Sequence, residues 1–233
     1  MEIIMFYFDP TYIIILPALI FAMWASARVD STFKKYERNY SFRGYTGAMA
    51  AREILNARGL YDVAIERVNG RLSDHYDPRT NVIRLSEAVY NSTSTAAIGV
   101  ACHEAGHAMQ YAENYFPIKF RALIIPITNI GSTFGIWLFI IGLIFSFPMI
   151  CFIGIILFSF TAIFQLATLP TEYNASKRAL AAIEESGILN PEEQQGAKKV
   201  LSAAALTYVA ALAVSLTQLL RLIVLFGSTR RRR

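Results

Sequence analysis

Residues 122–171 read ALIIPITNIGSTFGIWLFIIGLIFSFPMICFIGIILFSFTAIFQLATLPT and contain no Asp, Glu, Lys or Arg. One α-helix needs about 20 consecutive apolar residues to cross the hydrocarbon core of a bilayer. The run of 50 uncharged residues between Arg121 and Glu172 is therefore long enough for two crossings. We predict a transmembrane hairpin over 122–171 and interpret the chain as an integral membrane protein.

Two shorter apolar segments lie outside this hairpin. Residues 10–27 contain no charged side chain, and residues 203–226 contain only Arg221. We predict a first span at 10–28 and a fourth span at 203–227, which makes about four transmembrane helices. Arg221 must then face protein or water, or reach the membrane surface with its long side chain, because a charge is unstable in lipid.

The composition agrees with a membrane protein, since apolar residues make up 55% of the chain and charged residues 17%, with a mean hydropathy of +0.39. Soluble domains carry about 25% charged residues, so an ordinary soluble enzyme is disfavoured. The net charge is +5, but the terminal run Arg230–Arg233 supplies four of these charges. We interpret residues 228–233 as a basic tail beside the membrane and expect no nucleic-acid partner. Cys102 and Cys151 have apolar flanks and are interpreted as buried free thiols.

Charged residues return between the first span and the hairpin, where residues 30–121 contain ten Asp and Glu residues. We predict a small α+β domain there. Thr46 is suited to cap its first helix. The apolar face of that helix is predicted to include Met49, Ile54 and Leu55.

Three strands and a second helix are expected to follow in this domain. Apolar and polar residues alternate over 63–68, Asn69-Gly70 is typical of a tight hairpin turn, and Leu72 is predicted to open the return strand. Residues 82–85 are predicted as a third strand. An Ala-rich helix with its cap within 91–95 completes the domain.

A second polar segment, 172–202, follows the hairpin. Its first half has apolar residues at helical spacing, and Gly187 suits the end of that helix. Asn190-Pro191-Glu192-Glu193 is typical of a helix start, with a cap, a proline in the first turn and two acidic residues near the positive end of the helix dipole. We expect this last helix to continue into the fourth span.

The strongest chemical motif is His103-Glu104-Ala105-Gly106-His107, within the Ala-rich helix. Four residues advance an α-helix by about 400°, so the two imidazoles lie on one face and can bind the same tetrahedral ion. The pattern is typical of zinc hydrolases, in which the carboxylate takes a proton from water on the metal. We predict one Zn²⁺ ion, with His103 and His107 as ligands and Glu104 as the general base. Two structural histidines are the alternative, but they would leave a buried carboxylate unpaired.

Two acidic residues compete for the place of the third ligand. Glu113 lies six residues after His107, where one class of zinc proteases has a third histidine, but Gln110 replaces the glycine at which that class turns its chain. We therefore expect Glu113 to stay on a continuing helix and to point away from the metal. Glu172 follows the hairpin, and two crossings return the chain to the face it left. We predict Glu172 as the third ligand, with water in the open fourth position.

Three further features have both a functional and a structural interpretation. Asn174 and Ser176 lie within a turn of the predicted third ligand and are candidates for orienting a metal ligand. His75 is a candidate for substrate binding, or an ordinary hydrogen-bonded histidine. The strand 81–85 is suited to pair with a substrate backbone along its edge, or only to pack within the sheet.

These motifs resemble a known family, the neutral zinc metallopeptidases of bacterial membranes, often called the YugP-type family. The segments that carry the resemblance are Phe8-Asp9-Pro10-Thr11-Tyr12, Asp74-His75-Tyr76-Asp77-Pro78-Arg79-Thr80, Leu85-Ser86-Glu87, His103-Glu104-Ala105-Gly106-His107, Leu169-Pro170-Thr171-Glu172-Tyr173 and Ala203-Ala204-Ala205-Leu206-Thr207-Tyr208-Val209. The resemblance implies a zinc-dependent membrane protease, more distantly similar to the HtpX and Ste24 peptidases, whose third ligand is a glutamate after a transmembrane hairpin. Related peptidases often have aspartate where Ser176 stands.

We therefore predict an α-helical membrane protein with a small α+β, zincin-like (gluzincin-like) domain that hydrolyses peptide bonds. Its expected partners are the lipid bilayer and a protein or peptide substrate in or near the membrane; no feature specifies an oligomeric state. The alternative is a non-catalytic membrane scaffold with a structural zinc site, which would need no general base. A transporter is disfavoured because the hairpin has no ionisable residue to mark an ion path.

Basic residues are distributed unevenly around the predicted spans. The tail carries four arginines, whereas the face with the zinc motif carries Arg28, Lys34, Lys35, Arg38, Lys119, Arg121, Lys177, Arg178, Lys198 and Lys199. The positive-inside rule therefore places the active site in the cytoplasm.

A cysteine introduced beside Tyr90 tests this orientation. We expect an impermeant thiol reagent to leave it unlabelled in intact cells, because the membrane separates the two, and to label it in permeabilised cells. Labelling in intact cells would reverse the predicted orientation.

Overall fold

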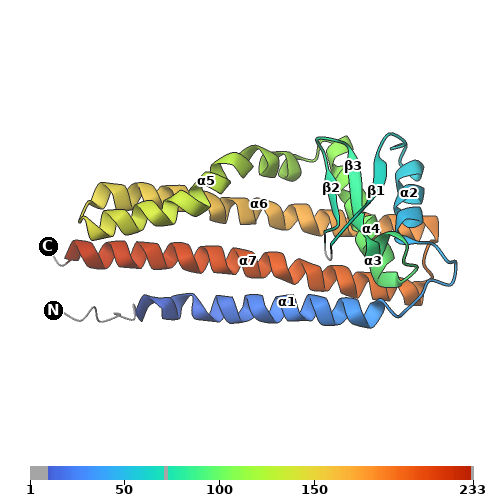
Figure 1. Ribbon diagram of the computed structural model, residues 1–233, viewed down its shortest axis with the longest axis horizontal. Helices are drawn as coiled ribbons and strands as arrows, with labels where there is room; N and C mark the ends of the chain where they lie inside the picture. Colours follow the sequence, from blue (N-terminus) through green and yellow to red (C-terminus); the bar gives the residue numbers. More distant parts are fainter. Residues whose placement is uncertain (1–9, 71–72, 232–233) are drawn as a thin grey trace. The chain divides into compact units, whose positions relative to one another are not determined.

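The computed structural model describes residues 10–70 and 73–231, and the chain is mostly helical (Figure 1). Its elements are the 3-10 helix η1 (Pro10–Ile14), α1 (Leu16–Tyr36), α2 (Gly47–Ala57), β1 (Ala64–Val68), β2 (His75–Asp77), β3 (Val82–Ser86), α3 (Glu87–Tyr90), α4 (Thr95–Ala112), α5 (Phe116–Ile144), α6 (Pro148–Ser186) and α7 (Pro191–Arg231). They divide into two compact units. The first takes in the described parts of Met1–Trp24, Leu123–Leu166 and Val209–Arg233, and the second consists of Ala25–Ala122 and Ala167–Tyr208.

The first unit contains the most apolar parts of the long helices. Among the described residues, three helices are long and apolar enough to cross a membrane: α5, α6 and the Pro191–Ser228 part of α7. The predicted hairpin corresponds to α5 and α6, with residues 145–147 as its turn. The predicted first span, 10–28, is divided between η1 and α1. Charged residues from Arg28 onward interrupt the apolar part of α1, which is not one of the three helices.

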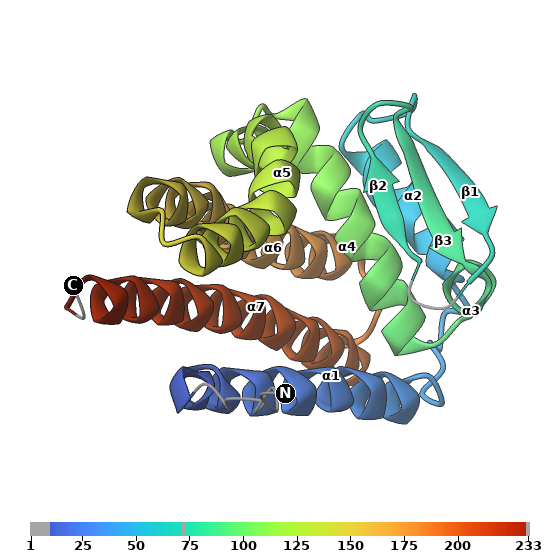
Figure 2. The same ribbon diagram turned by 60° about the vertical axis from the view of Figure 1, so that its left-hand side comes forward.

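Small residues let α5 and α6 pack closely within the first unit (Figures 1 and 2). A Cβ atom added at Gly154 would lie 2.7 Å from the carbonyl oxygen of Gly135. Neither position therefore has room for a side chain, as is common where two helices approach in a membrane. Beside this contact, a buried cluster is formed by Phe139, Cys151, Phe158 and Leu222.

In the second unit, α2 begins where the sequence predicts it. The Thr46 side chain accepts a hydrogen bond from the backbone N–H of Met49, and Ile54 and Leu55 are fully buried. Met49 itself is 54% exposed, so its assignment to the apolar face is wrong. The buried residues of α2 are Gly47, Ala50, Ala51, Ile54 and Leu55. At about 100° per residue, Met49 lies on the opposite side of the helix from these positions.

The sheet has the strand order β1-β3-β2. β1 pairs in parallel with β3, with Ala64 opposite Val82, and β2 pairs with β3 in the antiparallel direction. The hairpin predicted at Asn69-Gly70 is therefore wrong, because the neighbour of β1 is β3 and not the next strand of the chain. Leu72, the predicted start of a return strand, lies outside the described residues.

β3 occupies the centre of the sheet because it carries the most deeply buried side chains. Ile83 and Leu85 are fully buried in the core of this unit. A central strand has neighbours along both edges and offers no free backbone groups to a further strand. The hypothesis that 81–85 binds substrate by edge pairing is therefore wrong, and β1 and β2 are the edge strands.

α4 lies between β2 and α6 within the second unit (Figure 2). Its cap is Ser94, whose hydroxyl accepts a hydrogen bond from the backbone N–H of Ala97. The helix ends at Ala112, with Glu113 as its C-cap. The expectation that Glu113 lies on a continuing helix is wrong, because Asn114 adopts the left-handed conformation, with φ of 58°, and turns the chain away.

The two remaining predicted helix boundaries are confirmed. Gly187, with φ of 59°, follows the last residue of α6. The backbone N–H of Asn190 donates to Glu193, and the backbone N–H of Glu193 donates to the Asn190 side chain. This reciprocal cap starts α7, which runs without a break to Arg231.

α4 and α6 approach each other closely at Gly106. A Cβ atom at Gly106 would lie 2.5 Å from the carbonyl oxygen of Ala175. We expect Gly106→Ala to lower the free energy of unfolding by about 1–3 kcal/mol, the usual cost of overpacking, measured by thermal or denaturant unfolding. Gly227→Ala is the control, because a Cβ atom there has no neighbour within 4 Å. Equal stability of the two variants would show that α4 and α6 do not need this contact.

Candidate metal centre

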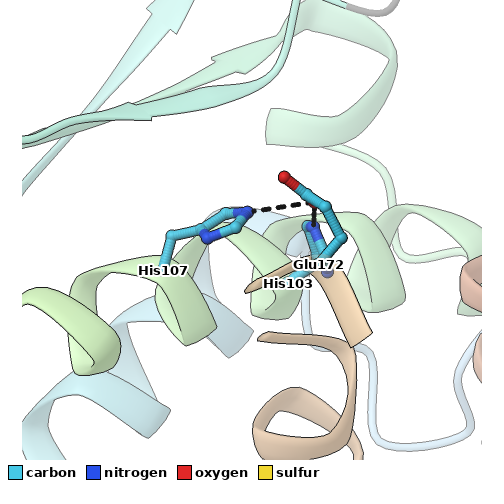
Figure 3. A group of neighbouring side chains, drawn as sticks. All are labelled: His103, His107 and Glu172. Atoms are coloured by element: carbon cyan, nitrogen blue, oxygen red, sulfur yellow. Dashed lines mark hydrogen bonds and ion pairs between the residues drawn. The ribbon is translucent and has the colours of Figure 1, made fainter. Parts of the chain in front are cut away.

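Three side chains converge in the second unit. His103 and His107 come from α4, and Glu172 comes from α6 (Figure 3). His103 Nε2 lies 3.2 Å from Glu172 Oε2, and His107 Nε2 lies 3.4 Å from the same oxygen. One ligand atom from each residue lies within 4.8 Å of the others. The structure thus brings together the three residues that the sequence predicts as metal ligands.

These distances fit the donor set of a tetrahedral zinc ion. Zinc bonds to nitrogen and oxygen are about 2.0–2.1 Å long, so two ligand atoms at neighbouring corners of a tetrahedron lie about 3.3 Å apart. The observed separations of 3.2 Å and 3.4 Å match this value. Two imidazoles and one carboxylate are also the three protein ligands found at one class of catalytic zinc sites.

The Glu172 carboxylate is 3% exposed. A buried carboxylate is costly unless it is paired and hydrogen-bonded. Arg121 supplies a partner, since its Nη1 lies 3.0 Å from Glu172 Oε1. Because Arg121 engages Oε1, Glu172 turns its other oxygen, Oε2, toward the two histidines.

His107 lies close to two negatively charged side chains. Burial lowers the pKa of the His107 imidazole. The hydrogen bond that the protonated ring makes to Glu172 and the negative charges of Glu104 and Glu172 outweigh burial, so the pKa lies above its ordinary value. The same negative environment favours any cation at this position, whether a proton or a metal ion.

The second nitrogen of each imidazole also has a partner. Ser176 Oγ lies 3.1 Å from His103 Nδ1. Gln110 Oε1 lies 3.0 Å from His107 Nδ1. Asn174, the other residue predicted to orient a ligand, is connected to a histidine only through Gln110, whose Nε2 donates to Asn174 Oδ1 at 2.9 Å.

Glu104, the predicted general base, lies beside the metal-ligand group and is not one of its members. Its side chain is 8% exposed, and its Oε2 accepts a hydrogen bond from the backbone N–H of Tyr76 at 2.9 Å. Tyr76 belongs to β2, so the sheet holds this carboxylate in position. The negative charge of Glu104 is close enough to raise the pKa of His107.

His75 is exposed and is not a member of the metal-ligand group. Its Nδ1 donates a hydrogen bond to the carbonyl of Ser73 at 2.7 Å. Two residues along β2, the carboxylate of Asp77 accepts hydrogen bonds from the backbone N–H of Arg79 and the side chains of Thr80 and Arg84, which lower its pKa to about 2. These contacts hold the turn between β2 and β3.

Glu113, the competing ligand, also lies outside the metal-ligand group. Its carboxylate forms an ion pair with Arg178, with Oε1 at 2.6 Å from Nη1. The hydrogen bond from Arg178 lowers the pKa of Glu113 below its ordinary value.

Three neighbours of the site, Gln110, Arg121 and Tyr76, are not among the residues predicted from the sequence to act there. Gln110 lies three residues after His107, and this spacing places the two side chains together on a helix. The sequence therefore contains a local signal for Gln110 as a partner of His107. Arg121 and Tyr76 have no such signal. Their roles depend on the packing of α5 and β2 against residues that are distant in the sequence.

Comparison with known proteins agrees with this donor set. A family described as "putative neutral zinc metallopeptidase" matches residues 11–227. The chain belongs to this family. It is also 48% identical, over 209 residues that make up 90% of this chain and 93% of the other, to the "Putative membrane protease YugP" of Bacillus subtilis (strain 168). No solved structure matches the chain. The family resemblance based on the sequence motifs is thereby confirmed, and membership in the zinc metallopeptidases supports zinc as the metal.

Glu172 and Glu113 form a matched pair for testing the third ligand, since each is paired with an arginine. We expect Glu172→Ala to reduce zinc affinity by more than the roughly 10- to 100-fold that loss of an outer contact costs, because it removes a ligand atom. Glu113→Ala is expected to bind zinc like the wild type. Competition with a chromophoric chelator measures both affinities. A Glu172→Ala protein that retains zinc and activity would refute this assignment.

Proposed function

We propose that this protein is a zinc-dependent metalloendopeptidase that cleaves proteins in or near the membrane. His103, His107 and Glu172 are proposed to hold one Zn²⁺ ion, and Glu104 is proposed to act as the general base. The observation that supports this function best is that His103 Nε2 and His107 Nε2 both face Glu172 Oε2, at 3.2 Å and 3.4 Å, while a second carboxylate, that of Glu104, is held beside them by another element.

The proposed chemistry divides the roles among these residues. When bound, Zn²⁺ supplies Lewis-acid activation of water and of the scissile carbonyl. Glu104 accepts the proton of the attacking water and then delivers it to the leaving amine. The backbone N–H of Tyr76 orients the Glu104 carboxylate while it does so. Ser176 and Gln110 keep the two imidazoles in their orientation by contacting the Nδ1 atoms.

A substrate backbone is proposed to bind along the edge strand β2, and not along the central strand β3 that the sequence suggested. β2 is an edge strand with β3 on one side only. The backbone N–H of Tyr76 is directed at Glu104 and not at β3. An extended peptide that pairs with this free edge would therefore pass next to the general base, as proteases that hold their substrates as added strands require.

The location of the protein is proposed from the spans and charges. The family relative is named as a membrane protease, and three apolar helices support membrane association. We propose four spans, at 10–28, in the two arms of 122–171 and at 203–227. The zincin-like domain of 30–121 and the segment 172–202 are proposed to face the cytoplasm.

A structural zinc site in a membrane scaffold is the alternative. Structural sites usually have four protein ligands, whereas catalytic sites have three and an open position. Among residues 10–70 and 73–231, the ligand group has three members. Glu104 would also have no function in a scaffold, although its burial is costly. Both observations favour the peptidase.

Glu104→Gln separates metal binding from catalysis. We expect the variant to bind zinc like the wild type but to lose casein hydrolysis by about 10²- to 10⁴-fold, the usual contribution of a general acid–base group, because the amide cannot take the proton. His103→Ala and His107→Ala are expected to lose both properties. Zinc content and casein cleavage of the purified proteins measure this.

Glu87→Gln is the control for the chemical change, since its side chain is exposed and lies on α3. It is expected to retain both properties. Undiminished cleavage by Glu104→Gln would exclude Glu104 as the base. Zinc binding without cleavage by the wild type would favour the scaffold.

A further inference from the structure

A chain of polar side chains leads from His107 to the surface of the second unit. His107 Nδ1 lies 3.0 Å from Gln110 Oε1, and Gln110 Nε2 donates to Asn174 Oδ1 at 2.9 Å. Arg178 Nε donates to the same Asn174 oxygen at 2.7 Å, and Arg178 is paired with Glu113. These hydrogen bonds therefore connect His107, a predicted ligand on α4, with Asn174 and Arg178 on α6.

The chemistry of one neighbour decides which way the Gln110 amide points. Gln110 Nε2 lies 2.8 Å from the backbone carbonyl oxygen of Thr171. A backbone carbonyl only accepts hydrogen bonds, so the Gln110 atom beside it must be the amide nitrogen. The other end of the amide, which faces His107, is then the carbonyl oxygen, and this oxygen needs a proton on His107 Nδ1.

A second, independent neighbour gives the same direction. Arg178 has only donors, so the Asn174 atom that contacts its Nε must be the carbonyl oxygen. That oxygen then requires a donor from Gln110, which its amide nitrogen supplies. The orientation of both amides thus follows from groups whose hydrogen-bonding roles cannot change.

We infer that Gln110 is a positioning residue that holds the proton of His107 on Nδ1 and so leaves the lone pair of Nε2 for the metal. The inference rests on the proposed zinc function. The nitrogen of an imidazole that carries the proton is set by the hydrogen bond of the other nitrogen. Gln110 thereby prepares His107 for coordination through the atom that lies 3.4 Å from Glu172 Oε2.

The two histidines differ in this respect. His103 Nδ1 contacts the Ser176 hydroxyl, which can donate or accept. Ser176 therefore accommodates either tautomer of His103, whereas Gln110 accommodates one tautomer of His107. Only His107, which Gln110 follows on the same face of α4, therefore has its tautomer fixed by its neighbour.

The burial of Gln110 supports this role. Its side chain is 0% exposed, and a buried amide stabilises a protein less than an apolar side chain unless its hydrogen bonds are complete. All three polar contacts of this amide are made, to His107, Thr171 and Asn174. Packing alone would be served by an apolar residue of similar size.

Gln110→Met tests the inference, because methionine has a similar length and offers no strong acceptor. We expect zinc affinity of the purified full-length protein, measured by chelator competition, to fall about 10- to 100-fold, as for other outer contacts of a ligand histidine. Gln194→Met is the matched control. Gln194 also donates to a backbone carbonyl, that of Leu189, but has no contact with a histidine, and its variant is expected to bind zinc like the wild type.

The tautomer of His107 is the second measurement. The chain has three histidines, so nitrogen NMR of the metal-free, ¹⁵N-histidine-labelled protein resolves each ring, and the loss of signals in His107→Asn assigns the relevant one. We expect the neutral ring of His107 to carry its proton on Nδ1 in the wild type and to shift toward Nε2–H in Gln110→Met. A merely structural role of Gln110 would not move this signal.

Each outcome decides for or against the inference. Unchanged zinc affinity in Gln110→Met, or a neutral His107 ring that carries its proton on Nε2 in the wild type, overturns it. If Gln110→Met does not fold, the wild-type spectrum decides alone. If the wild type binds zinc but cleaves nothing, the proposed peptidase function fails, while the tautomer of the metal-free protein still tests the role of Gln110.

Discussion

The buried carboxylate of Glu172 is the constraint around which the second unit is arranged. A carboxylate that is 3% exposed must be surrounded by donors or cations. Arg121 satisfies one oxygen and the two histidines of α4 face the other. Because the histidines lie on α4 and the carboxylate on α6, the site exists only while these two helices are in close contact.

Small side chains make this contact possible. α4 is rich in alanine and buried on almost all sides, and Gly106 lies against the backbone of α6 at Ala175. The glycine stands within the zinc motif itself, between its two predicted ligands. The predicted ligands and the glycine that allows close packing therefore belong to one short motif.

The surroundings of the site come from three separate elements. β2 holds Glu104 through a backbone N–H, α6 supplies Glu172 and the Ser176 partner of His103, and α5 supplies Arg121. The partner of His107, Gln110, lies on α4 itself. Backbone and arginine groups, whose hydrogen-bonding roles are invariant, stand at the ends of these contacts. Family membership supports zinc chemistry, and these contacts indicate how each group is oriented for it.

Local sequence patterns are sufficient to predict much of the fold and the placement of the two histidines of the site. Caps at Thr46 and Asn190, the two apolar arms of the hairpin and the spacing of His103 and His107 are all encoded within a few turns of one helix, where the geometry is known in advance. Tertiary packing alone settled the rest. β1 pairs with β3 across a long connection, and Tyr76 and Arg121 acquire their roles from distant neighbours. Contacts between remote segments depend on how whole elements pack and leave no periodic trace in the chain.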